Sequence, residues 1–196
     1  MSEYADLLYP GLREMGKYQT IVMDPPWPTG YSGKSPARKG EKWAKGWDYP
    51  QLPIEDILEI PMESIMDDDC IVFIWTVMGH PVAPHTLMRR WGIQYMYEMI
   101  WMKNGGPKAG VYRPTYNHEK VVVGRKGNPD TQRMDGIKTA NHWPRRQHSK
   151  KPDEFYEMLL QFTPSPRLDI FARDYKEGFA VYGNELPDSG ALSVSV

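Results

Sequence analysis

The chain has 196 residues, with 24 lysines and arginines against 25 aspartates and glutamates, so its formal net charge is −1. A length of this order suits one domain, since soluble domains usually contain roughly 100–200 residues. A single cysteine, Cys70, excludes a disulfide framework and a multi-cysteine zinc site, which favours a reducing compartment. No apolar run approaches the ~20 residues that span a bilayer, and the first residues lack a signal-peptide pattern. We therefore expect a cytoplasmic protein with one domain over residues 1–196.

The first half of the chain alternates expected strands and helices. Residues 18–23 form a short β-prone run that stops at a pair of prolines, and residues 54–66 have mixed helical spacing interrupted by Pro61, which favours a short helix or turn. After three aspartates at 67–69, the continuous apolar run 70–75 is typical of a strand covered on both faces. Residues 81–91 then predict a helix that ends at Gly92.

The second half continues the same alternation. We expect strands at 95–102 and at 119–123, the latter ending at Gly124, and a helix at 153–162 with Pro152 at its first helical position. Two further strands are expected at 168–171 and 179–182. Strands alternating with helices predict an α/β fold with a mostly parallel sheet flanked by helices, and such sheets bind ligands beyond the carboxyl ends of their strands.

Positive charge is concentrated in two stretches although the total is nearly neutral. Residues 125–151 contain eight cations and two anions, and residues 28–47 contain five cations and one anion. Both stretches include aromatic residues, among them Tyr31 and Trp143. Basic loops interleaved with aromatics suit a polyanion that carries flat bases, although a solvated loop face is the simpler alternative.

The tetrapeptide Asp24-Pro25-Pro26-Trp27 follows the first expected strand directly. One reading is a strand-ending turn. The other is chemical, because a carboxylate and a backbone carbonyl held side by side each accept one N–H of an exocyclic adenine amine. The two prolines hold φ at about −65° and remove two N–H donors, so the carbonyl of Pro25 has a fixed direction. Trp27 offers a flat face on which an extruded base could stack. The tetrapeptide thus favours direct transfer to an amine by positioning and electrostatics.

This tetrapeptide resembles the catalytic motif of the N6-adenine methyltransferase family typified by the eukaryotic mRNA adenosine methyltransferase, which has bacterial and phage DNA-modifying members. Further stretches resemble successive blocks of that family in order: 73–76, 91–92, 100–103, 118–127, 151–154, 168–173 and 183–185. The likeness runs from about residue 18 to residue 185, so we place the core there and expect residues 186–196 to be a flexible tail. The resemblance implies a Rossmann-like, S-adenosyl-L-methionine-dependent methyltransferase fold with a permuted motif order.

The resemblance also implies which residues meet the cofactor. Asp24 would touch both the target amine and the methionine end, Lys151 the carboxylate or ribose, and Arg173 the ribose hydroxyls. The full implied cofactor set is Asp24, Lys151, Arg173, Asn184, Glu185 and Asp6. Residues 168–173 lack the glycine-rich turn of many other adenine methyltransferases, and residues 174–176 do not clearly preserve the family's polar contact.

The expected substrate contacts come from three sources. Glu119 matches a position that lines the family's target-base pocket, Lys103 and Asn104 follow an expected strand, and the remaining contacts belong to the motif or the basic loops. The full set is Trp27, Tyr31, Lys103, Asn104, Glu119, Arg145 and Arg146. Without a separate recognition domain, the loops at 28–50, 103–116 and 125–150 would read the nucleic acid.

Several alternatives stay open at this point. Cys70 lies in an apolar run and is more typical of a buried small side chain than of a nucleophile, and the five histidines lack metal-site spacing. The favoured function is an N6-adenine methyltransferase acting on DNA, as in bacterial or phage DNA modification and restriction-modification. RNA methylation, methylation of a protein amide or small molecule, and a non-catalytic nucleic-acid-binding scaffold are the alternatives. A homodimer or a partner subunit would extend the footprint, and no metal or membrane is implied.

Overall fold

A computed structural model of the chain describes residues 3–28, 51–104, 115–131, 134–144, 150–184 and 186. Seven strands form one sheet in the order β5-β3-β4-β2-β1-β6-β7. The strands are β1 (Tyr18–Met23), β2 (Met66–Thr76), β3 (Gln94–Met102), β4 (His118–Lys126), β5 (Ala140–His142), β6 (Arg167–Ile170) and β7 (Ala180–Tyr182). Around the sheet lie α1 (Glu3–Leu8), η1 (Leu12–Met15), α2 (Ile54–Leu58), α3 (Met62–Ile65), α4 (Ala83–Arg90) and α5 (Asp153–Phe162). None of the helices described is long and apolar enough to cross a bilayer.

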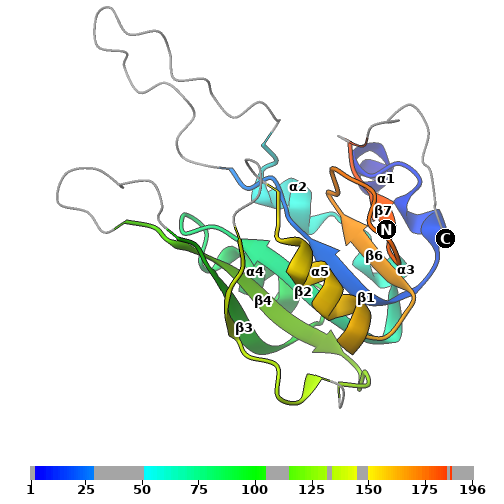
Figure 1. Ribbon diagram of the computed structural model, residues 1–196. Helices are drawn as coiled ribbons and strands as arrows, with labels where there is room; N and C mark the ends of the chain where they lie inside the picture. Colours follow the sequence, from blue (N-terminus) through cyan, green and yellow to red (C-terminus); the bar gives the residue numbers. More distant parts are fainter. Residues whose placement is uncertain are drawn as a thin grey trace, which may run out of the picture.

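The sheet is mostly parallel, as expected. β1 pairs in parallel with both β2 and β6, while β6–β7 and β3–β5 are also parallel. Only β4 runs against its neighbours β2 and β3, and its arrow in Figure 1 points opposite to those of β1, β2 and β6. The amino end of β4 therefore lies at the same edge as the carboxyl ends of the other strands.

Successive apolar residues of β1 and β2 point to opposite faces of the sheet, so a core forms on each face. Ile21, Met23, Val72 and Ile74 pack with α2, α3, α4 and η1 on one face. Val22, Ile71, Phe73 and Trp75 pack with α5 on the other, and Figure 1 shows α5 in front of the sheet with α4 behind it. Residues 70–75 are thus buried from both sides, which confirms the expectation of a doubly covered strand and of a buried Cys70.

Burial dominates the placement of α5. Phe155, Tyr156 and Leu159 are all buried, and each such side chain contributes about 1.5–3 kcal/mol when removed from water. Pro152 precedes the helix as its N-cap with ψ 137°, so the expectation that it occupies the first helical position is wrong. An extended ψ does not belong to a helical residue, and the first turn begins instead at Asp153.

Two expected strand boundaries are also wrong. β2 begins at Met66, which pairs with Tyr18, and it includes Asp67–Asp69; the register with β1 shifts between Met66 and Ile71, and Asp68 and Asp69 are exposed to solvent there. β4 continues through Gly124 to Lys126, and a Cβ on Gly124 would lie 2.7 Å from Cγ2 of Ile93. Glycine is needed there for close packing rather than for a turn.

The strand β1 is the switch point of the sheet. From β1 the next strand in the chain, β2, lies on one side, whereas β6 and β7 lie on the other. In open α/β sheets the crevice beyond the carboxyl end of such a strand is where ligands bind. The residue at that place is Asp24.

Candidate active site

The backbone of residues 24–28 is held by its neighbours at the carboxyl end of β1. The N–H of Asp24 donates to the carbonyl of Ile170 at 3.4 Å, and that of Trp27 donates to the carbonyl of Pro25 at 2.8 Å. The N–H of Leu52 donates to the carbonyl of Pro26 at 2.9 Å. Because prolines cannot donate to a strand ladder, β1 ends here and the chain turns across the end of the sheet.

Four charged side chains of alternating sign form a row at this edge. The Nζ of Lys151 donates to Oδ2 of Asp24 at 2.9 Å and to Oε2 of Glu119 at 3.0 Å. The other carboxylate oxygen of Glu119 pairs with the ammonium group of Lys103. Asp24 follows β1, Glu119 is the second residue of β4, Lys103 follows β3 and Lys151 lies just before α5. Residues separated by more than 120 positions in the chain thus meet at one place.

The environment shifts the pKa values of this row. Burial raises the pKa of Asp24 above its ordinary value, although Lys151 and Arg173 pull it back. Burial also acts to raise the pKa of Glu119, but the ammonium groups of Lys151 and Lys103 outweigh it and hold the pKa below the usual range. For Lys151, burial acts to lower the pKa, and the two carboxylates reverse this and raise it. Lys151 therefore remains charged and stabilises both carboxylates.

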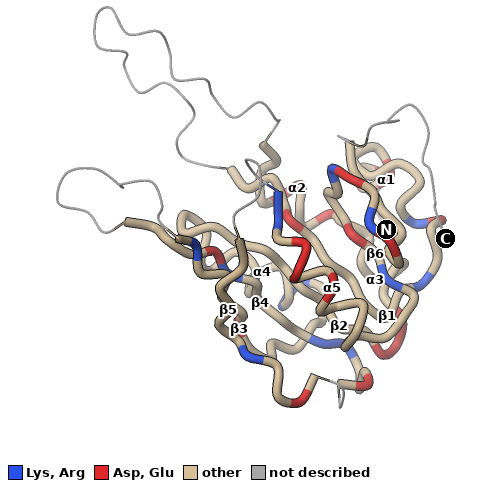
Figure 2. The backbone as a smooth tube through the Cα atoms, viewed as in Figure 1, with Lys and Arg blue, Asp and Glu red and all other residues tan. Residues whose placement is uncertain are grey.

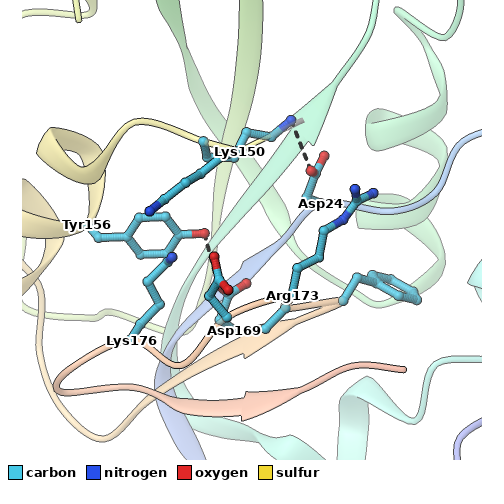
Figure 3. Close-up of a pocket in the computed structure, with 10 residues that line it drawn as sticks. Asp24, Lys150, Tyr156, Asp169, Arg173 and Lys176 are labelled. Atoms are coloured by element: carbon cyan, nitrogen blue, oxygen red, sulfur yellow. Dashed lines mark hydrogen bonds and ion pairs between the residues drawn. The ribbon is translucent and has the colours of Figure 1, made fainter. Parts of the chain in front are cut away.

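A pocket of about 150 Å³ lies beside Asp24 and opens to solvent. Figure 3 shows Asp24, Tyr156, Asp169, Arg173 and Lys176 around it, with Arg173 extending toward Asp24. Lys150, Lys151 and Phe171 complete much of the lining. The pocket thus offers cations, carboxylates and aromatic faces within one enclosure.

Two lining residues give this pocket its floor. The hydroxyl of Tyr156 donates to Oδ2 of Asp169 at 2.9 Å, and burial raises the pKa of Asp169 to about 7. Sequence reasoning missed both residues, although a lone acid in the apolar run 168–171 was a usable signal. A buried carboxyl with a raised pKa inside a cleft is a common mark of a functional site.

Phe171 was expected to end a strand, and this is wrong. β6 ends at Ile170, and Phe171 has a left-handed backbone with φ 65°. This conformation costs a bulky residue about 1–2 kcal/mol. The turn redirects the chain so that residues 171–174 line the pocket.

Trp27 does not offer a free stacking face in this structure, contrary to expectation. Its side chain is 4% exposed, its indole N–H donates to the carbonyl of Trp75 at 3.0 Å, and its ring is stacked with His80. The expectation fails because the indole packs beneath the turn, where it stabilises the motif instead of facing a base.

The remaining expected site residues divide into three groups. Asn104 and Asn184 are exposed at the same edge as Asp24, after β3 and β7. Asp6 lies on α1, is paired with Arg13 and does not line the pocket. Tyr31, Arg145, Arg146 and Glu185 lie outside the described residues.

Comparison with known proteins identifies the family. The profile of the family described as MT-A70 matches residues 18–185, which is most of the chain. The chain belongs to the MT-A70 family. The activity class of MT-A70 proteins is methyl transfer to the N6 amine of adenine, and their methyl donor is S-adenosyl-L-methionine, so the chain is a methyltransferase that uses this cofactor.

Individual MT-A70 relatives differ in length. The chain is 28% identical over 187 residues to the type II methyltransferase M.MunI of a Mycoplasma species, covering 88% of this chain and 79% of that protein. It is 25% identical over 197 residues to the human N(6)-adenosine-methyltransferase catalytic subunit METTL3, and 26% identical over 188 residues to an MT-A70-like protein of Arabidopsis thaliana. These alignments cover 92% and 88% of the chain but only 30% and 24% of those longer proteins.

The pocket beside Asp24 fits the cofactor of the MT-A70 family. S-adenosyl-L-methionine carries a carboxylate, an ammonium, a sulfonium, a ribose and an adenine. The lining has Lys150, Lys151 and Arg173 for the anion, Asp24 and Asp169 for the cations, and two aromatic rings.

Proposed function

We propose that this chain methylates the N6 amine of a flipped adenine in DNA by direct transfer from S-adenosyl-L-methionine. The observation that carries the proposal is the position of Asp24. It follows the switch-point strand of an MT-A70 fold, lies on the wall of the pocket described above, and is paired with Lys151. The cofactor supplies an electrophilic methyl carbon on a sulfonium.

The chain's own groups orient the amine. The carboxylate of Asp24 accepts one N–H of the adenine amine and the carbonyl of Pro25 accepts the other. That carbonyl already accepts the N–H of Trp27, which fixes its direction and leaves its second lone pair for substrate. These two acceptors raise the electron density on nitrogen and aim its lone pair.

The reaction balances without a covalent enzyme intermediate. The nitrogen lone pair forms the new N–C bond as the C–S bond breaks, and the electron pair of that bond stays on sulfur. The extra proton on the methylated nitrogen passes to Asp24 and then to solvent. The burial that raises the pKa of Asp24 suits this brief acceptance of a proton.

We propose the other cofactor and substrate contacts from the family resemblance, together with the position of the described residues at the edge of the sheet. Lys151 and Arg173 bind the carboxylate and ribose of the cofactor, and Asn184 and Glu185 hold its ribose or adenine, as the family resemblance implies. Glu119 and Lys103 face the target base, with Asn104 beside them. Tyr31, Arg145 and Arg146 contact the phosphate backbone through the basic loops, while Asp6 remains a cofactor contact by resemblance only.

We choose DNA over RNA as the substrate because of how much of each relative's length the chain covers. The chain covers 79% of a type II methyltransferase, a designation used for DNA-modifying enzymes. RNA is the second candidate, since the N(6)-adenosine methyltransferases of animals and plants align over most of this chain. A second copy or a partner subunit would lengthen the bound nucleic-acid segment.

The test is transfer of a labelled methyl group from S-adenosyl-L-methionine to matched unmethylated DNA and RNA, followed by nuclease digestion. We expect N6-methyladenine in the DNA product. N6-methyladenosine in RNA alone would overturn the choice of polymer, and a product other than N6-methyladenine would overturn the chemistry. The absence of both cofactor binding and methyl transfer to either polymer would favour the scaffold alternative.

An Asp24→Asn variant tests the mechanism. The amide keeps the size of the carboxylate but replaces one acceptor by a donor, so we expect turnover to fall by about 10²-fold or more. The fold should persist, since Asp24 lies beyond the end of β1 and is not part of either core. Circular dichroism provides the control, and wild-type turnover in a folded variant would contradict the assigned role.

A further inference from the structure

In the loop that follows β2, the side chain of His80 contacts the catalytic motif. Its ring is stacked with the ring of Trp27, with centroids 5.8 Å apart and an interplanar angle of 20°. Its Nε2 also forms a hydrogen bond with the carbonyl oxygen of Pro28. His80 thus touches two residues on the carboxyl side of Asp24, although it does not line the cofactor pocket.

We propose that His80 is a positioning residue for methyl transfer, which clamps Trp27 and Pro28 and thereby sets the direction of the Pro25 carbonyl and of Asp24. The inference rests on the proposed function, since it assigns His80 to that reaction. His80 does not touch the reacting atoms. It acts through the backbone of the motif.

The connection from His80 to the reacting edge runs through Trp27. The indole ring is held by His80 on one face and by the Trp75 carbonyl, which accepts its N–H at 3.0 Å. The backbone N–H of the same residue donates to the Pro25 carbonyl at 2.8 Å. A displacement of the indole that shifts the backbone of Trp27 therefore also shifts the N–H that holds the Pro25 carbonyl, which is proposed to receive the adenine amine.

His80 is itself fixed to the end of the sheet. Its carbonyl accepts the hydroxyl proton of the buried Thr76 at 2.9 Å, and its N–H donates to the carbonyl of Val77 at 2.9 Å. Because the Pro28 carbonyl only accepts, Nε2 of His80 must carry a proton. The hydrogen bond to Pro28 thus selects one tautomer and one orientation of the His80 ring.

Three variants separate the two contacts of His80. His80→Phe keeps a ring against Trp27 but removes the donor, His80→Gln keeps a donor but removes the ring, and His80→Ala removes both. His85→Gln is the matched control, because His85 lies on α4, 3.8 Å from Glu98, on a different part of the surface. Single-turnover methyl transfer gives the rate, and calorimetry gives the affinity for S-adenosyl-L-methionine.

We expect His80→Ala to lose about 10²-fold in rate, the size of effect that a displacement of about 1 Å produces. His80→Phe and His80→Gln should each recover part of it. The affinity for the cofactor should stay within about twofold in all variants, and His85→Gln should match wild type. A rate within about twofold of wild type in His80→Ala would overturn the proposal, as would a parallel loss of rate and cofactor affinity.

A spectroscopic readout separates this inference from the proposed function. Nitrogen-15 spectra of histidine-labelled wild-type protein should show the His80 ring in a single state with the proton on Nε2, and His80→Phe assigns the signal. Rapid averaging between tautomers would overturn the clamp whatever the substrate is. If wild-type protein methylates no adenine but shows the fixed ring, the proposed function fails and the clamp remains as a structural contact only.

Discussion

Lys151 is the residue on which the electrostatics of the site depend. Its side chain is 11% exposed and holds the carboxylates of Asp24 and Glu119 on either side, with its Nζ 4.9 Å from the centre of the Trp75 ring. Removing one partner of a buried charged cluster leaves the others uncompensated, which is costlier than the cluster itself. Without Lys151, two carboxylates would face each other across the position of an ammonium group.

Replacing Lys151 by methionine therefore has a predictable effect on pH dependence. Burial already raises the pKa of Asp24, and loss of the cation that lowers it raises that pKa further. Activity requires the ionised carboxylate, so the acid limb of the rate profile should move to higher pH in Lys151→Met. Rates measured across pH with saturating cofactor test this shift.

Lys120→Met is the matched control for that profile. Lys120 is the next residue along β4 from Glu119 and pairs with Glu98 at 2.9 Å, away from Asp24. Its substitution should leave the acid limb in place. An acid limb of Lys151→Met that coincides with that of wild type would contradict the electrostatic account.

The raised pKa of Asp169 should make the free energy of unfolding depend on pH. Burial raises the pKa of Asp169 to about 7 in the folded chain, whereas an unfolded aspartate has a pKa of about 3.9. Between these values the folded state binds more protons, so the free energy of unfolding falls as pH rises, by up to about 1.4 kcal/mol per pH unit. Asp169→Asn removes this titration and keeps an acceptor for the Tyr156 hydroxyl.

The free energy of unfolding of Asp169→Asn, relative to wild type, should therefore increase by about 2 kcal/mol from pH 5 to pH 7 and level off above pH 7. Urea unfolding at several pH values measures the difference. A difference that stays constant across this range would show that Asp169 titrates alike in both states.

At the scale of elements, the end of β6 and the turn after it form one wall of the pocket beside Asp24, and the end of β7 packs against that turn. The N–H of Ala172 donates to the carbonyl of Tyr182 at 3.1 Å, so the two segments lie side by side beyond the strands. A Cβ on Gly183 would lie 2.0 Å from the carbonyl oxygen of Ala172. That oxygen belongs to backbone, which cannot rotate away as a side chain can. Gly183 thus permits the close approach that holds residues 171–174 at the pocket.

Gly183→Ala should separate these segments and weaken cofactor binding. The comparison is Gly124→Ala, where the added Cβ meets Ile93 and the backbone of Gln94, away from the pocket. Both variants should lose about 1–3 kcal/mol of stability through overpacking. Only Gly183→Ala should also lose affinity for S-adenosyl-L-methionine, measured by calorimetry well below the melting temperature. Equal affinities in the two variants would contradict the assignment of this wall.

At the scale of the whole molecule, charge is balanced overall and uneven along the chain. In the described part, basic and acidic residues are interspersed over the tube in Figure 2. The stretch at 125–151, by contrast, has eight cations and two anions in sequence. A protein that binds DNA through such a stretch releases counterions, so its affinity falls steeply with salt.

Replacing Arg145 and Arg146 together by glutamate tests this view. We expect the KM for DNA to rise at least tenfold at physiological salt and the slope of log KM against log salt to become shallower by about 1–2. The affinity for S-adenosyl-L-methionine in the absence of DNA should not change. A lower kcat with unchanged KM would assign these arginines to a role other than backbone contact.

Much of this protein was predictable from local sequence. The order of strands and helices, the sheet type and the motif at Asp24 follow from apolar periodicity and from prolines, which act within a few residues of the chain. The short polar strand β5 and the helices α1 and η1 escaped this reasoning, since residues such as Asn141 and His142 carry no apolar pattern. The resemblance of successive blocks was enough to identify the MT-A70 family, which the family match confirms.

Only the tertiary structure shows which side chains contact the motif. Sequence alone placed Asp24, Lys151 and Glu119 in one site only by resemblance, whereas the fold pairs them through strands that meet at one edge. It also turned Trp27 inward against His80, and it brought Asp169 and Tyr156 together as the floor of the pocket. The physical reason is that local sequence specifies backbone direction and the buried face. The partner of a charged or aromatic side chain depends on segments that approach only when the sheet assembles.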